Sequence, residues 1–257
     1  MRKIILTLLI LAQISLVLAI QPFGAETRFI NSTRAPIDPA QSVQAQAGNV
    51  TEIDIFGYSP TQTWQGYFGN ITGTIQLADA GDNVMYNWSL ASPQGEIYTS
   101  LNDSIDWTNI QCFNFTADGT KNDDTANAGN TSLHGTNLTQ LEESFNIDFD
   151  DVDGVNETFN LFGAGTHDMF YTNNLQFTEG ECRSTRLFGN SGSGVDNEFE
   201  EVLMYDPITE SVIFASIIDE DVLGFDGRSH DFQMLVLEDG HGTDTAESTY
   251  YFYVELE

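Results

Sequence analysis

The sequence is poor in basic residues. It has 8 lysines and arginines against 39 aspartates and glutamates, which gives a formal net charge of −31. Two of these bases, Arg2 and Lys3, stand at the N-terminus, and Lys121 is the only lysine after them. Such a charge repels phosphate groups and excludes nucleic acid and anionic lipid surfaces as partners. It favours a hydrated surface, a high-salt habitat or divalent cations as partners.

Cysteines are also few. The two present, Cys112 and Cys182, exclude a scaffold held together by many disulfides. In an exported chain they predict one bridge between them, and two unpaired buried thiols are the alternative.

Long apolar runs are absent except for one at the start of the chain. This run, Ile4–Ile20, follows the basic start Met1–Lys3 and ends near the small residue Ala19. This pattern predicts a secretory signal peptide over residues 1–20. An uncleaved membrane anchor is the first alternative, since the run is long enough to span a bilayer. The second is a pilin-type leader cut before the apolar run, although no Gly or Ala follows Lys3. The membrane is therefore a partner only through this segment, if it is uncleaved.

Recognisable catalytic motifs are lacking. The four histidines show no HExxH pattern or other two-residue ligand spacing for zinc. Gly192-Ser193-Gly194 lacks the pattern of a nucleophile elbow and is typical of a flexible turn. We therefore predict no catalytic residue and no resident cofactor, and we expect a protein that is not an enzyme.

Acidic clusters offer the only candidate metal ligands. Residues 148–154 approach a calcium loop, but Phe149 stands at the first ligand position and Asn160 replaces the closing glutamate. A second cluster surrounds residues 219–226. Calcium is thus the one metal to test, and a solvated acidic turn is the alternative in both places. The candidate ligands are Asp150, Asp151, Asp153, Asp219 and Asp221.

Sequons for N-glycosylation are plentiful and one-sided. All of them precede Asn160, and none of the later asparagines is followed by the required Ser or Thr. This distribution predicts a glycosylated N-terminal half and a bare C-terminal half that can pack against another protein. The asparagines are Asn31, Asn49, Asn70, Asn87, Asn102, Asn114, Asn130, Asn137 and Asn156.

Alternating polar and apolar residues predict β-strands along most of the chain. In Val84–Leu90, Trp88 is expected to face the core and the sequon residue Asn87 the solvent. Residues 49–55 alternate in the same way, and residues 137–145 have the spacing of one short helix. Four aromatic residues are suited either to packing in a core or to stacking against sugars at the surface, namely Trp64, Tyr67, Trp88 and Trp107.

These patterns predict an all-β protein, an immunoglobulin-like or related β-sandwich in one or two lobes with one short helix. After the leader, residues 21–48 are expected to form a linker or edge segment, and residues 49–257 the sandwich. Within it, a polar insertion at 117–158 would separate sub-lobes 49–116 and 159–257.

Three short runs carry a resemblance. They are Gly48–Glu52, Trp64–Asn70 and Tyr250–Val254. In these runs the chain resembles exported archaeal cell-surface glycoproteins, a group without an established activity. The resemblance implies an archaeal, envelope-exposed glycoprotein and brings no catalytic residue with it.

The expected function is a structural or interaction role as a coat or filament component of the cell surface, whose partners are other envelope proteins or further copies of the chain. The first alternative is a surface adhesin or carbohydrate-binding module stabilised by divalent cations. The second is a secreted hydrolase with two carboxylates facing each other across a cleft.

Overall fold

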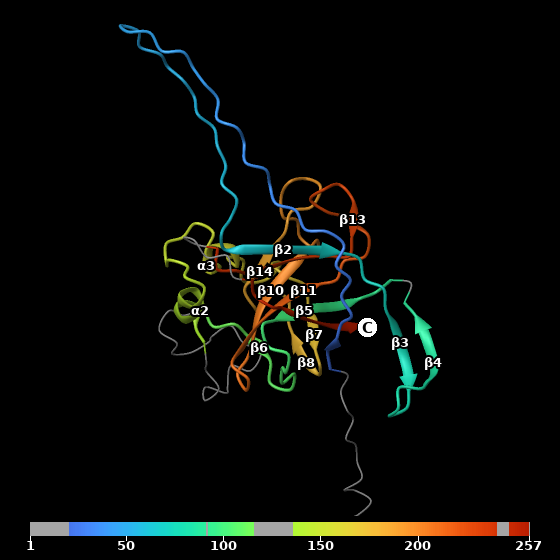
Figure 1. Ribbon diagram of the computed structural model, residues 1–257. Helices are drawn as coiled ribbons and strands as arrows, with labels where there is room; N and C mark the ends of the chain where they lie inside the picture. Colours follow the sequence, from blue (N-terminus) through green and yellow to red (C-terminus); the bar gives the residue numbers. More distant parts are fainter. Residues whose placement is uncertain (1–20, 91, 116–135, 241–246, 257) are drawn as a thin grey trace, which may run out of the picture.

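The computed structural model describes residues 21–90, 92–115, 136–240 and 247–256 (Figure 1). These residues form antiparallel sheets and two short helices, an all-β, sandwich-like fold as the sequence predicts. The expected leader, residues 1–20, lies outside the described residues.

A seven-stranded sheet is the centre of the molecule. β5 (Gly95–Ser100) lies between two C-terminal strands, so the predicted sub-lobes 49–116 and 159–257 share one sheet. The division into sub-lobes is therefore wrong. In spatial order the strands are β1 (Phe23–Gly24), β15 (Tyr251–Leu256), β5, β11 (Ser211–Ile217), β10 (Glu200–Asp206) and β6 (Gln111–Cys112), and β9 (Ser184–Arg186) also pairs with β10.

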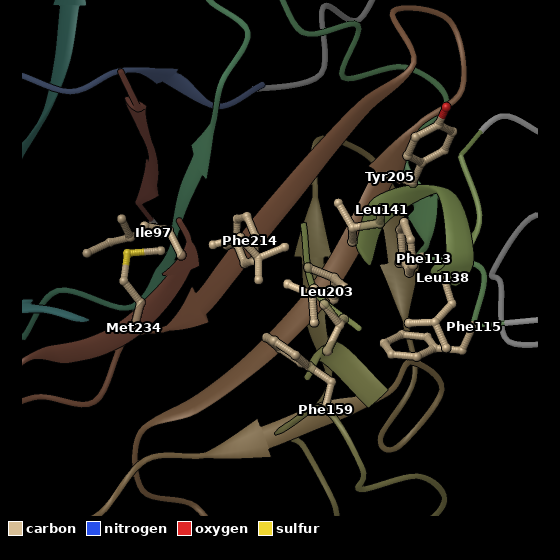
Figure 2. Close-up of a cluster of buried hydrophobic side chains, with 14 of the residues drawn as sticks. Ile97, Phe113, Phe115, Leu138, Leu141, Phe159, Leu203, Tyr205, Phe214 and Met234 are labelled. Atoms are coloured by element: carbon tan, nitrogen blue, oxygen red, sulfur yellow. The ribbon is translucent and has the colours of Figure 1, made fainter. Parts of the chain in front are cut away.

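Both faces of this sheet are covered. Along β10, Leu203 and Tyr205 enter one apolar cluster, while Val202 and Met204 enter another on the opposite face. This is the alternation of side chains along a strand. On the first face, β2 (Trp64–Gly69) pairs with β14 (Phe232–Leu237), and β14 packs on β10 and β11. Figure 2 shows this cluster, with Leu203 and Phe214 of the sheet surrounded by side chains of other elements.

Two helices complete the first face. α2 (Leu138–Ser144) confirms the predicted short helix, and the side chain of Asn137 caps it by accepting a hydrogen bond from the backbone N–H of Gln140. α3 (Val155–Thr158) is a further single turn. Leu138, Leu141 and Val155 are buried in the first cluster. The described part of the predicted polar insertion is therefore part of the core.

The opposite face is covered by the hairpin of β7 (Phe170–Thr172) and β8 (Leu175–Phe177). The disulfide Cys112–Cys182 lies in this cluster, with its Cα atoms 5.2 Å apart, and confirms the predicted bridge. It ties β6 to the segment that precedes β9. A small pair, β12 (Val222–Leu223) and β13 (Ser229–His230), lies outside the main sheet.

Two segments leave this body. Residues 26–62, here called the arm, form neither helix nor strand and run out and back as two adjacent limbs (Figure 1). The strand predicted at 49–55 is not formed in the isolated chain, and the linker predicted to end at residue 48 continues to residue 62. The second segment is the hairpin of β3 (Thr74–Ala78) and β4 (Val84–Ser89), a separate two-stranded sheet.

Candidate interaction surface

The arm exposes large apolar side chains along most of its length. Ile37, Ile55 and Phe56 are 93%, 84% and 91% exposed. The arm is fixed at its base and its tip. Near the base, the Tyr58 hydroxyl donates to the carbonyl of Pro36 at 2.9 Å and links the two limbs. At the tip, the N–H of Asn49 donates to the carbonyl of Gln46 at 3.2 Å and closes a turn.

The β3–β4 hairpin has one apolar and one polar face. Ile75 pairs with Trp88 and Leu77 with Tyr86, so these four side chains share a face. Trp88 is 50% exposed and Tyr86 60%, and their rings lie 4.9 Å apart. The prediction that Trp88 enters the core is wrong, because the hairpin projects from the body instead of packing on it (Figure 1). Asn87 lies on the opposite, polar face and is exposed, as the alternation predicts.

The predicted glycosylation sites differ in exposure. Asn31, Asn49, Asn70 and Asn87 are exposed, and all four lie on the arm, on the hairpin or between the hairpin and β2. Asn102 and Asn156 are half-buried, and Asn130 lies outside the described residues. Asn114 and Asn137 are only 4% and 8% exposed, and Asn137 serves as the helix cap. A glycan at either buried position is incompatible with the packing around it.

The candidate calcium ligands of the first cluster make local hydrogen bonds. Asp151 accepts from the N–H of Asp148 at 2.9 Å, and Asp153 accepts from the Thr61 hydroxyl of the arm at 2.5 Å. Asp150 is exposed. Within the described ranges, no group of three or more His, Cys, Asp or Glu side chains is arranged to hold a metal.

In the second cluster, Asp219 and Asp221 hold the loop after β11. Asp219 accepts from the N–H of Phe199 at 2.7 Å, and burial raises the pKa of its carboxyl to about 6. The N–H of Asp221 donates to Asp231 at 3.1 Å. Both aspartates are thus built into the loop that links β11 to β12.

Two histidines have defined roles in the fold. Nε2 of His230 lies 2.9 Å from a carboxylate oxygen of Asp226, a partner four residues away that the sequence does not reveal. Nε2 of His167 accepts from the N–H of Cys182 at 3.1 Å, and burial lowers the pKa of this imidazole. The hydroxyl of Ser193 lies 3.1 Å from that of Ser191, its neighbour in the turn. His134 and His241 lie outside the described residues.

A buried pair of carboxylates is not evident from the sequence. Glu96 and Glu255 are opposite each other on β5 and β15, and they are 3% and 4% exposed. The hydroxyl of Tyr98 lies 3.4 Å from an oxygen of each, and burial, followed by these two carboxylates, raises the pKa of Tyr98 well above its usual value. Glu255 also accepts from the N–H of Asn173 in the β7–β8 turn. The pair joins that turn to the sheet, and its burial keeps both carboxylates away from solvent.

A groove of about 390 Å³ opens beside α2. It combines apolar and acidic side chains, and it lies away from the buried glutamate pair. Its lining includes Leu141, Phe145, Phe214 and Tyr250, with the carboxylates of Asp103 and Glu210. Asn102, a half-buried sequon residue, also borders it.

Comparison of the chain with protein-family models, with curated proteins and with solved structures finds no match. In the described part of the chain, neither helix has the length and apolar character needed to cross a membrane.

Proposed function

We propose that this protein is a non-enzymatic, secreted or cell-surface glycoprotein of an archaeal-type envelope, and that it acts as a coat or filament component. The observation that carries the proposal is the pair of projecting segments. The arm and the β3–β4 hairpin expose their large apolar side chains although the body beside them has two well-filled clusters. Large apolar side chains exposed in such number are typical of protein–protein contacts.

The compartment proposed is extracellular. The disulfide Cys112–Cys182 is consistent with an oxidising environment. The leader, the exposed sequons and the resemblance to archaeal surface proteins support secretion, glycosylation and an archaeal envelope. The partners are other envelope proteins or further copies of the chain.

The test is the mass of the native protein in solution. The full chain is expressed, gently released from the envelope of its host and measured by light scattering. A large, regular particle supports a coat or filament component. A monodisperse monomer over a range of protein and salt concentrations contradicts the proposal.

A second candidate function is carbohydrate binding in the groove beside α2, as in an adhesin. It is favoured by the aromatic rings of Phe145 and Tyr250 close to the carboxylates of Asp103 and Glu210. Calorimetric titration of neutral oligosaccharides, with and without Ca²⁺, tests it. A heat of binding that is lost in Phe145→Ala supports this role, and the absence of heat in both conditions contradicts it.

A further inference from the structure

The arm contains a segment with the sequence pattern of a strand but no sheet to join. In residues 49–56, Ile53 and Ile55 alternate with Glu52 and Asp54, which gives one apolar and one acidic side. The described structure leaves the whole segment exposed and without a ladder. A strand forms where the N–H and C=O groups of another strand pair with its own. The sequence pattern therefore suits a sheet that is not in the same chain.

The β3–β4 hairpin lacks a third strand. It is a sheet of two strands, and in the described chain both of its outer edges are open. A two-stranded sheet is marginal by itself, and a third strand adds both a ladder and apolar contacts. Ile75, Leu77, Tyr86 and Trp88 form a ready apolar face for Ile53 and Ile55 to extend. Residues 49–56 are also long enough to run along either strand, since β3 and β4 have 5 and 6 residues.

We propose that residues 49–56 of one copy form a β-strand along the β3–β4 hairpin of a second copy, with Ile53 and Ile55 beside the hairpin's apolar face. This inference depends on the proposed function and names the contact through which copies associate. The donor segment and the acceptor hairpin are different surfaces of one chain. The contact is therefore head-to-tail, and it continues from copy to copy unless a ring closes.

The unpaired strand pattern and the open hairpin belong to the same chain, so a second copy can supply the one to the other. Residues 27–37 of the outgoing limb contain Arg28 and Arg34 and no acidic residue, in a chain with a net charge of −31. Both arginines are exposed. These two charges match an acidic surface locally, whereas the whole arm, which also contains Glu26, Asp38, Glu52 and Asp54, has a formal charge of 2 − 4 = −2. Asn87 lies on the polar face of the hairpin, so a glycan attached there would leave the apolar face free.

Cross-linking between two differently labelled copies tests the contact. One full-length copy carries Ile53→Cys, and the other carries Leu77→Cys in β3 or Trp88→Cys in β4. The two are mixed with a short bis-maleimide cross-linker. Cys112 and Cys182 are buried and bonded to each other, so the reagent reports the introduced thiols. Ile208→Cys, in the turn between β10 and β11, is a matched acceptor control because Ile208 is 50% exposed and Leu77 is 51% exposed.

We expect a cross-linked heterodimer with one of the hairpin acceptors and several-fold less with Ile208→Cys. Equal yields with hairpin and control acceptors would overturn the proposal. It is also overturned if Ile53→Cys and Trp88→Cys in one chain react only within that chain. If the wild-type protein assembles but these cross-links are absent, the inference fails and the proposed function stands. If the wild type is a monomer, the proposed function fails as well.

Discussion

Gly95 begins β5 with a φ of +118°, in the region that favours glycine. A Cβ atom there would lie 2.1 Å from the backbone oxygen of Glu255 on the neighbouring strand. We expect Gly95→Ala to lower the free energy of unfolding by about 3 kcal/mol, the upper end of the cost of a strained backbone. Gly163→Ala is the control, because Gly163 has a φ of +98° and open space around it. Urea unfolding compares the two, and an equal loss would show that the contact with Glu255 adds nothing.

The raised pKa of Asp219 predicts that the stability of the fold depends on pH. Burial raises its pKa from 3.8 to about 6, so the folded protein binds this proton more tightly than the unfolded chain. Its contribution to stability is therefore present below about pH 4 and lost as the pH rises to about 6. Asp219→Asn keeps an acceptor for the N–H of Phe199 and removes the charge. As the pH rises from 4 to 7, we expect the free energy of unfolding of Asp219→Asn to increase by about 1–2 kcal/mol relative to that of the wild type. This value is reduced because the carboxyl of Asp219 is partly exposed.

Unfolding in urea at several pH values measures this difference. Glu220→Gln, an exposed neighbour, removes the same charge from the surface and is the control. If the difference in unfolding free energy between Asp219→Asn and wild type stays constant from pH 4 to pH 7, ionisation of Asp219 does not lower the stability of the fold.

The local sequence pattern predicts whether a segment is a strand or a helix better than it predicts what the segment packs against. Strand β4 forms where the alternation of Val84–Leu90 predicts it, and the helix α2 forms where the spacing of residues 137–145 predicts it. The alternation places Asn87 and Trp88 on opposite faces of β4 correctly. It does not tell whether the apolar face meets the body, because that depends on contacts between distant parts of the chain. The same limit explains residues 49–55, whose pattern is that of a strand without a partner in the chain.

For the candidate site, too, the sequence shows which residue types are present but not which of them are buried or lie opposite each other. The sequence reveals the sequons, but not that Asn114 and Asn137 are buried or that Asn137 caps α2. It gives no sign that Glu96 and Glu255 are opposite each other, since 159 positions separate them in the sequence. A glutamate two residues from a core tyrosine in both strands was the available signal.

Two tryptophans test whether the hairpin is independent of the body. Trp107 is 4% exposed beside Tyr98 and Tyr253, whereas Trp88 is 50% exposed on the hairpin. We expect Trp107→Ala to cost about 3–5 kcal/mol of unfolding free energy. Trp88→Ala should change it by less than about 0.5 kcal/mol, as at other surface positions. Both values are measured by urea unfolding in dilute protein, where copies are apart. A large loss in Trp88→Ala would show that the hairpin supports the body.

At the scale of the molecule, the disulfide closes a loop of 70 residues across the second cluster. It restricts the unfolded chain more than the folded one, an effect of about 4 kcal/mol in the chain-entropy description. We expect the free energy of unfolding of the variant Cys112→Ala/Cys182→Ala to be lower by about 2–5 kcal/mol. The measurement is urea unfolding of the variant and of the oxidised wild type. A loss below about 1 kcal/mol would mean that the bridge adds little beyond the packing around it.

The net charge of −31 sets the conditions in which copies can meet. Repulsion between such chains opposes any contact through the arm and the hairpin, and salt shortens its range. We expect the light-scattering mass of the full chain to rise between about 0.1 M and about 2 M NaCl. Salt weakens the pairing of Arg28 and Arg34 with acids as well, but two charges per chain are outweighed by the net repulsion. The variant Ile53→Asp/Ile55→Asp should stay monomeric at both concentrations, and Val152→Asp, on an exposed loop of the body, should assemble like the wild type. A mass that falls with salt would mean that attraction between opposite charges, and not apolar contact, holds the copies together.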